Sequence, residues 1–147
     1  MDGNQFEMFS LIISEISKHL HKMTAELMKQ YGLNGSHAMY FLAFYRYPDG
    51  MSASQICEQC CRDKSDVSRT VSVLTDKGFL IKEASPKIQH RTVFKLSDKG
   101  KETAEHLLEK VNYFSELLEA KLGAERQEEL YESLKSVLYM LSEYNKR

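Results

Sequence analysis

Residues 52–78 read SASQICEQCCRDKSDVSRTVSVLTDKG and contain two short helical patterns separated by a tight turn. Ser52 followed three residues later by Gln55 is a capping box, which opens the first helix. Either Asp63 or Ser65 can cap the second helix, which ends before the glycine that closes the segment. Two short helices joined in this way are typical of a helix-turn-helix.

The second of these helices has two unlike faces. Val67, Val71 and Leu74 recur at helical spacing and are expected to face inward. The opposite face carries small hydroxyls and one arginine, which allows it to enter a DNA major groove deeply while Arg69 reaches base edges. The alternative interpretation is that this face contacts only solvent. The residues of the outer face are Ser65, Asp66, Ser68, Arg69 and Ser72.

The periodicity then changes from helical to alternating. Residues 79–83 and 92–96 are short β-prone runs, which predict a small hairpin. Lys87, His90 and Arg91 lie at its tip, where cations suit the minor groove or its phosphates, with Arg91 the expected inserted side chain. The alternative is a loop that is polar only for solubility.

Long helices are predicted on both sides of this middle region. Apolar residues recur at three- and four-residue steps from Phe9 to Leu27, which predicts a helix over residues 4–30. A similar pattern starts at Ser97, is interrupted by Gly123 and then continues to the C-terminus. Each terminal helix has a wide apolar face that a second copy of the chain could cover.

A shorter helix is predicted over residues 37–47, with Asn34 or Ser36 as its N-cap. Its aromatic side chains have two interpretations. They fill the core, which is the usual role of an aromatic stripe, or they line a small-molecule effector pocket between the helix-turn-helix with its hairpin and the long terminal helices. The aromatic residues are Tyr40, Phe41, Phe44 and Tyr45.

Length and composition limit the class of protein. The chain has 147 residues, of which 42% are hydrophobic and 28% charged, as expected for one soluble globular domain. No window approaches the roughly 20 apolar residues of a membrane-spanning helix. The N-terminus is acidic where a signal peptide needs positive charge. We therefore expect a cytoplasmic protein without a membrane partner.

Charge is distributed unevenly along the chain. Residues 62–101 contain 10 Lys/Arg against 5 Asp/Glu, whereas residues 1–61 contain 4 against 6 and residues 102–147 contain 6 against 10. A basic middle region between acidic ends favours a polyanion-binding surface. An ordinary uneven surface is the alternative.

Three cysteines lie within five residues. A structural zinc site usually needs two separated ligand pairs, and there is no second pair, so no metal site is predicted. Cys57 and Cys60 are expected to pack as small apolar residues, whereas Cys61, nearer the helix end, is a candidate for oxidant sensing. The chain also has no nucleophile-base motif or phosphate loop, so we predict neither an enzyme nor a cofactor.

The stretch from Leu33 through Gly100 resembles the MarR family of bacterial transcriptional regulators. Residues 56–69 match the pattern of the family's helix-turn-helix, and residues 74–80 look like its helix exit. Residues 96–100 resemble the family's strand-to-helix junction. The terminal helices match the dimerisation region by pattern.

The resemblance implies a mainly α fold, a winged helix-turn-helix with a small β-hairpin wing and long N- and C-terminal dimerisation helices. Residues 1–32 and 102–147 would form the helical dimerisation region, and residues 33–101 the DNA-binding region. The wing departs from the family, because residues 88–91 lack an acidic residue and one arginine. The predicted DNA-binding residues are Lys64, Ser65, Asp66, Ser68, Arg69, Ser72, Lys87, His90 and Arg91.

By this resemblance the protein is expected to be a sequence-specific transcriptional regulator and a homodimeric repressor. Its partners would be double-stranded DNA with a pseudo-palindromic operator and a small, often aromatic, ligand or an oxidant that releases the DNA. The alternative is a winged-helix protein-interaction module that has lost DNA binding. Salt dependence separates the two, because binding to phosphates weakens as salt rises.

Overall fold

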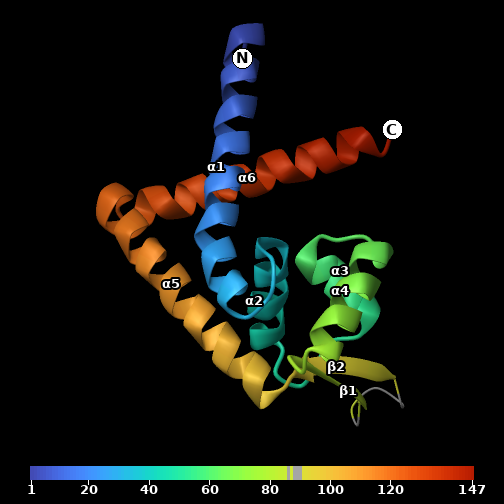
Figure 1. Ribbon diagram of the computed structural model, residues 1–147. Coiled ribbons are helices and arrows are strands. Elements are labelled where there is room, and N and C mark those ends of the chain that lie inside the picture. The colour runs from blue at the N-terminus through green and yellow to red at the C-terminus, as the bar shows by residue number, and fades with distance from the viewer. Residues whose placement is uncertain (86, 88–90) are drawn as a thin grey trace. The chain divides into compact units, whose positions relative to one another are not determined.

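The computed structural model describes residues 1–85, 87 and 91–147, which form two compact units, Met1–Leu108 and Glu109–Arg147. His90, a predicted wing contact, lies outside the described residues. Figure 1 shows the elements along the chain. They are α1 (Gly3–Gln30), the 3₁₀ helix η1 (Gly35–His37), α2 (Ala38–Arg46), α3 (Ala53–Cys60), α4 (Lys64–Asp76), β1 (Leu80–Ala84), β2 (Thr92–Leu96), α5 (Asp98–Leu122) and α6 (Ala124–Asn145).

Side-chain caps explain where the short helices begin. Asn34 accepts the backbone N–H of Ser36 at 3.1 Å and so caps the 3₁₀ helix η1. α2 follows directly, with His37 as its N-cap and no side-chain cap, so neither Asn34 nor Ser36 caps α2 itself. Ser52 Oγ accepts the N–H of Gln55 at 3.3 Å, and the Gln55 side chain accepts the N–H of Ser52 at 2.9 Å. The predicted capping box of α3 is therefore confirmed.

The two strands form the predicted antiparallel hairpin, in a register that pairs Leu80 with Leu96. Met51 pairs with Phe94 of β2 through two backbone hydrogen bonds of 2.9 Å. β1 begins at Leu80, one residue later than predicted, because the N–H of Phe79 donates at 2.8 Å to a carbonyl of α4. The hairpin directly follows α4 and contacts it, as Figure 1 shows.

The core of the first unit is built mainly from α2, α4, the hairpin and α5. The rings of Phe41 and Phe79 meet edge to face, with centroids 5.5 Å apart. Burial of large apolar side chains is the main stabilising contribution to such a fold. The largest fully buried side chains are Tyr40, Phe41, Phe44, Phe79, Met28, Met51, Ile56, Leu74, Leu107, Val67, Val93 and Thr103.

The junction between β2 and α5 requires a glycine at position 100. A Cβ atom on Gly100 would lie 2.1 Å from the carbonyl oxygen of Phe79, which no side chain tolerates. Ser97 Oγ accepts the N–H of Gly100 at 3.1 Å and donates to the carbonyl of Gly78 at 2.5 Å. These contacts hold the start of α5 against the end of α4.

Apolar side chains are exposed in each unit. In α1 the exposed set runs from Phe6 to Leu20, and Ile12 is 51% exposed. In the second unit, every residue of α6 is described and none is buried; Leu138, for example, is 64% exposed. Contiguous apolar exposure of this kind marks an interaction surface. Among the described residues, no helix combines the length and the hydropathy needed to cross a membrane.

Candidate nucleic-acid interface

The first turn of α4 is organised around Asp63. Its Oδ1 accepts the backbone N–H of Asp66 at 2.7 Å, so Asp63, rather than Ser65, is the cap, and the helix begins at Lys64. Ser65 is left exposed beside Lys64. A hydroxyl and an ammonium next to a helix N-terminus are suited to an anion such as a phosphate.

The two faces of α4 are those that the sequence predicts. Val67, Val71 and Leu74 are buried. The outer face combines small hydroxyls with cationic side chains, and it also carries one apolar side chain, Val73, which is 37% exposed one turn beyond Arg69. Its exposed residues include Lys64, Ser65, Ser68, Arg69 and Ser72.

Asp66 differs from the other predicted contacts because it is half-buried. Its Oδ1 accepts a hydrogen bond from the hydroxyl of Tyr40 on α2, and a weaker one of 3.5 Å from Thr70 Oγ1. Burial, together with the hydrogen bond to Asp66, raises the pKa of Tyr40 well above its usual value. The phenol therefore stays protonated and remains a donor at physiological pH.

The other end of α4 is connected to α1 and α5 by two lysines. Lys77 Nζ donates to the carbonyl of Gly32, after α1, at 3.0 Å. Lys99 Nζ, in the first turn of α5, donates to the carbonyl of Lys77 at 2.9 Å and lies 4.3 Å from the ring centroid of Phe79. α4 is thus held by polar contacts at both of its ends.

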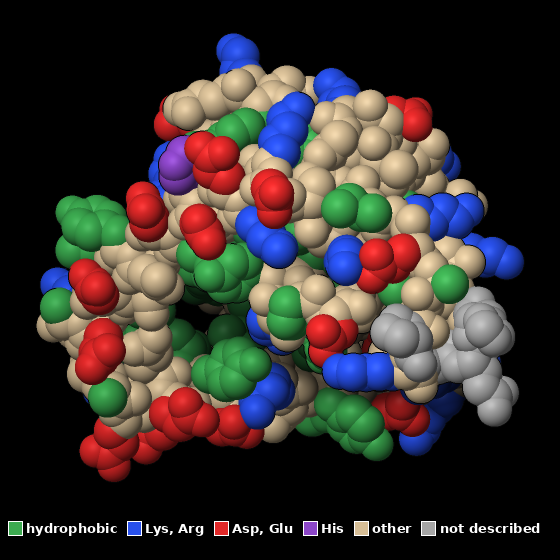
Figure 2. Space-filling view, turned by 90° about the horizontal axis from the view of Figure 1, so that it is seen from below, with side chains coloured by type: hydrophobic (Ala, Val, Ile, Leu, Met, Phe, Trp, Pro, Cys, Tyr) green, Lys and Arg blue, Asp and Glu red, His purple; other side chains and the backbone are tan. Residues whose placement is uncertain are grey.

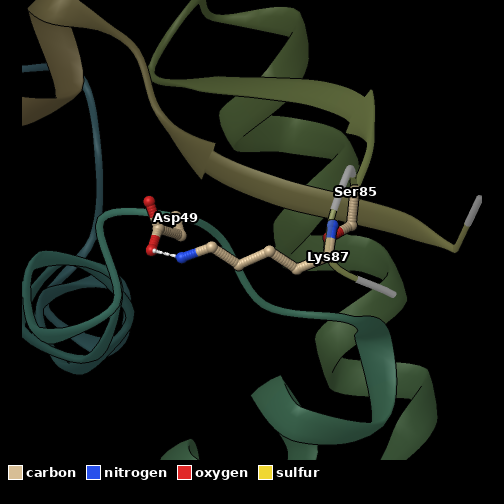
Figure 3. Close-up of polar contacts among 3 residues, drawn as sticks. All are labelled: Asp49, Ser85 and Lys87. Carbon is tan, nitrogen blue, oxygen red and sulfur yellow. Dashed lines mark hydrogen bonds and ion pairs between the residues drawn. The ribbon is translucent and has the colours of Figure 1, made fainter. Parts of the chain in front are cut away.

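Lys87, a predicted wing contact, makes two polar contacts (Figure 3). Its Nζ lies 2.7 Å from Oδ2 of Asp49, in the turn after α2, and its backbone N–H donates to Ser85 Oγ at 3.3 Å. The hydrogen bond from Lys87 lowers the pKa of the Asp49 carboxyl. Arg91 is exposed, and its carbonyl accepts the N–H of Ser85 at 2.8 Å. Arg91 therefore faces solvent, while Lys87 is partly neutralised.

Basic side chains surround the hairpin, with acidic ones among them, as Figure 2 shows. Lys95 Nζ lies 2.7 Å from Glu83 Oε1 on the neighbouring strand. Lys82 is exposed, with its Nζ 6.0 Å from the ring centroid of Phe94. The basic excess of the middle region therefore lies mainly on the hairpin, because within α4 the two cations Lys64 and Arg69 are matched by Asp66 and Asp76. The hairpin contacts α4.

A groove of about 750 Å³ lies between α3, α4 and the hairpin. Val67, Val71 and Phe94 contribute apolar surface to it. Thr75 also lines the groove, and its buried hydroxyl has no hydrogen-bond partner among the described residues. Because Ser68 and Ser72 are part of its lining, the groove borders the outer face of α4.

The aromatic residues proposed for an effector pocket occupy two environments. Tyr40, Phe41 and Phe44 are at most 1% exposed, whereas Tyr45 is 41% exposed. The first three are core side chains in this conformation, so a ligand would have to displace them or bind beside Tyr45. The pocket itself stays a prediction.

The three cysteines are free and unequally exposed. Cys57 and Cys60 are half-buried rather than fully buried, and Cys61 is exposed. Burial raises the pKa of the Cys60 thiol to about 11, which disfavours its thiolate. In the described part of the chain, no group of three or more His, Cys, Asp or Glu side chains is arranged to hold a metal ion.

Two features of this surface have no signal in the sequence. Asp49 is recognisable only as part of a turn, and nothing marks it as the partner of Lys87, 38 residues away. Tyr40 belongs to an aromatic stripe, and its hydroxyl contact with Asp66 spans 26 residues. A structure is needed to find such pairs because both depend on how the helices pack.

Comparison with known proteins agrees with this fold. Residues 31–87 match the sequence model of the MarR family. No curated protein matches the chain in sequence.

Several solved structures resemble the whole chain. A DNA complex of S. aureus MepR is 18% identical, with a TM-score of 0.77 over 90% of this chain and 96% of that chain. The transcriptional regulator SlyA is 17% identical, with a TM-score of 0.78 over 92% and 94%. NadR in complex with 4-hydroxyphenylacetate is 16% identical, with a TM-score of 0.73 over 88% and 91%. These likenesses establish the winged helix-turn-helix fold.

Proposed function

We propose that this chain, of which residues 31–87 match the MarR family model, is a sequence-specific DNA-binding transcriptional regulator of that family. The observation that carries the proposal is the outer face of α4, where exposed Arg69 stands among the small hydroxyl side chains of Ser65, Ser68 and Ser72. Small side chains let a helix approach the floor of a major groove, and an arginine there reads guanine.

The exposed cations on α4 and on the hairpin contact two different grooves of the DNA. α4 enters the major groove, with Arg69 at base edges and Lys64 and Ser65 at a phosphate beside the helix N-terminus. The hairpin follows the backbone, and Arg91 enters the minor groove or contacts its phosphates. MepR, which has the same fold, is solved as a DNA complex, and this supports DNA binding by the fold.

The regulator acts as a homodimer. Residues 1–32 and 102–147 form the dimerisation region, and residues 33–101 the winged helix-turn-helix. The exposed apolar side chains in the first half of α1 and on α6 support this assignment, because a partner copy would cover them. A two-fold dimer recognises a pseudo-palindromic operator whose half-sites lie roughly 10 base pairs apart.

The proposed action is repression that ends when an effector binds. A small aromatic ligand is one candidate, supported by the NadR complex with 4-hydroxyphenylacetate. An oxidant acting on exposed Cys61 is the other. Either would release DNA by favouring a conformation in which α4 no longer fits its groove.

Fluorescence anisotropy tests the proposed function. The protein is titrated into labelled DNA from upstream of its own gene and into a scrambled duplex, at two salt concentrations. We expect tighter binding to the upstream DNA than to the scrambled duplex. The logarithm of the association constant should fall linearly with the logarithm of the salt concentration, with a slope near -0.9 per phosphate contact. Equal binding to both duplexes with no salt dependence would instead favour the protein-interaction module.

A further inference from the structure

The recognition helix of a DNA-binding protein must be held against rotation about its own axis. Its apolar contacts through Val67, Val71 and Leu74 are not directional, so they tolerate small rotations. A hydrogen bond between a helix and its neighbour is directional, because it weakens steeply when the angle or the distance changes. The first turn of α4 contains one such bond.

From this geometry we propose that Tyr40 is a positioning residue for DNA recognition, acting through Asp66 to fix the orientation of the first turns of α4. The inference rests on the proposed function. It assigns to Asp66 an internal role in place of a contact with DNA. The supporting observation is that the hydroxyl of Tyr40 on α2 donates to Asp66 Oδ1.

The surroundings of this bond make it persistent. Tyr40 is 1% exposed, and its ring is confined by the core. Thr70 donates to the same Asp66 oxygen one turn further along α4, at 3.5 Å. The backbone N–H of Asp66 is held by Asp63 Oδ1 at 2.7 Å. The side chain and the backbone of Asp66 are therefore both held by hydrogen bonds.

The position of Asp66 on the helix links this bond to the outer face. Successive residues are 100° apart, so Ser65 lies about 100° and Arg69 about 60° from Asp66 around the axis. A rotation of 10° displaces a side-chain head near the helix surface by about 1 Å. A bidentate contact from Arg69 to a guanine does not survive such a shift, because hydrogen bonds need donor–acceptor distances near 3 Å.

The charge of Asp66 supports the same role. A carboxylate on a surface that approaches DNA is repelled by phosphates, so turning it towards Tyr40 removes an unfavourable contact. Phosphate contacts by Lys64, Ser65 and the hairpin do not depend on a precise helix rotation. The hydrogen bond from Tyr40 to Asp66, called the anchor below, therefore governs selectivity between sequences and not affinity for DNA in general.

The test measures selectivity in variants of the full-length protein. Duplexes enriched from a random pool by the wild type are compared with a scrambled duplex by anisotropy, at several salt concentrations. The variants are Tyr40→Phe, Asp66→Ala, Asp66→Asn and the double variant Tyr40→Phe/Asp66→Ala. Tyr47→Phe, at the end of the same helix, is the matched control. Thermal unfolding of each variant identifies a temperature at which all are folded.

For Tyr40→Phe we expect the ratio of enriched to scrambled affinity to fall about tenfold, the size of one hydrogen bond to a charged group. The salt slope should stay unchanged. Asp66→Ala should lose the same factor, and the double variant no more, because both changes break one bond. Asp66→Asn keeps an oxygen acceptor but loses its charge, so its selectivity should lie between that of the wild type and that of Asp66→Ala. Tyr47→Phe should have no effect.

Three results would overturn the anchor. Unchanged selectivity in Tyr40→Phe would show that the hydroxyl does not position α4. A loss in Asp66→Ala alone would place Asp66 in direct contact with a base. A drop in the salt slope together with an equal loss on all duplexes would assign the effect to phosphate contacts. A wild type that enriches no sequence would overturn the proposed function itself, which is a distinct outcome.

Discussion

Lys87 at the hairpin tip and Asp49 in the turn after α2 form an ion pair, with Nζ and Oδ2 2.7 Å apart (Figure 3). Their side chains are 72% and 76% exposed, so the pair contributes little to stability. Under the proposed function, the pair affects DNA binding. A lysine that already has a carboxylate partner must exchange it for a phosphate, and the net gain is smaller than for a free lysine.

Asp49→Asn should therefore strengthen DNA binding. We expect affinity for all duplexes to rise about two- to fivefold, the range for an exposed ion pair, with an increase of up to about 0.9 in the salt slope. Because Lys87 lowers the pKa of Asp49, the carboxylate stays charged at neutral pH and loses its charge only as pH falls through this lowered value. The gain should thus be constant around neutral pH.

The control for this prediction is Asp49→Asn in a Lys87→Ala background, where no gain is expected. A gain of the same size in that background would mean that Asp49 acts by general repulsion of DNA and not through Lys87.

Arg69→Ala should weaken operator binding by about 1–3 kcal/mol and relax the sequence preference, because a base-reading arginine is lost. Anisotropy with operator duplexes mutated one base pair at a time measures both effects. Arg126→Ala, in the first turn of α6, is the control and should leave binding unchanged. An equal loss on every sequence would reassign Arg69 to a phosphate.

Ile12→Glu should disrupt the homodimer. Ile12 is 51% exposed in the apolar stretch of α1, and burying a charge in an apolar interface is costly. We expect sedimentation equilibrium to show at least about a tenfold weaker association, with weaker operator binding, because only a dimer engages both half-sites. Lys22→Glu, on the polar side of α1, is the control. A wild type that is monomeric at micromolar concentration would contradict the proposed dimer.

Cys61→Gly should stabilise the protein. Cys61 has φ of 51°, a left-handed conformation at the end of α3 that is unfavourable for a residue with a Cβ. Glycine relieves this strain, but it also raises the conformational entropy of the unfolded chain, which offsets part of the gain. The net effect should be an increase of about 0.5–1 kcal/mol in the unfolding free energy. Urea unfolding measures it. Cys60→Gly, inside α3, should destabilise instead, and Cys61→Ser should change little.

The cysteines should differ in their rates of alkylation. The Cys60 thiol has a pKa of about 11, so little of it is thiolate at pH 8, whereas Cys61 is exposed. Iodoacetamide followed by mass spectrometry should modify Cys61 first. The rate at Cys60 should rise about tenfold per pH unit until the pH approaches its pKa. Fast modification of Cys60 at pH 8 would contradict its burial.

The sequence predicted the limits of most helices to within about one residue, but the structure decided between Asp63 and Ser65 as the cap of α4. Caps such as Ser52 and stop signals such as Gly78 act within a few residues, so their effects are local and visible in the chain. The spacing of Val67, Val71 and Leu74 identified the inner face of α4, because helical geometry ties that spacing to one side. Exposure of Ser65 and Arg69 followed from the same geometry.

Contacts between distant parts of the chain were decided only by the tertiary structure. The choice between a core and a pocket role for Tyr40 depended on which side chains surround it, and these come from several elements. The pairing of Tyr40 with Asp66, and of Lys87 with Asp49, depended on how α2 packs against α4 and on where the hairpin tip lies. Directional polar contacts require three-dimensional placement, which periodicity and composition do not contain.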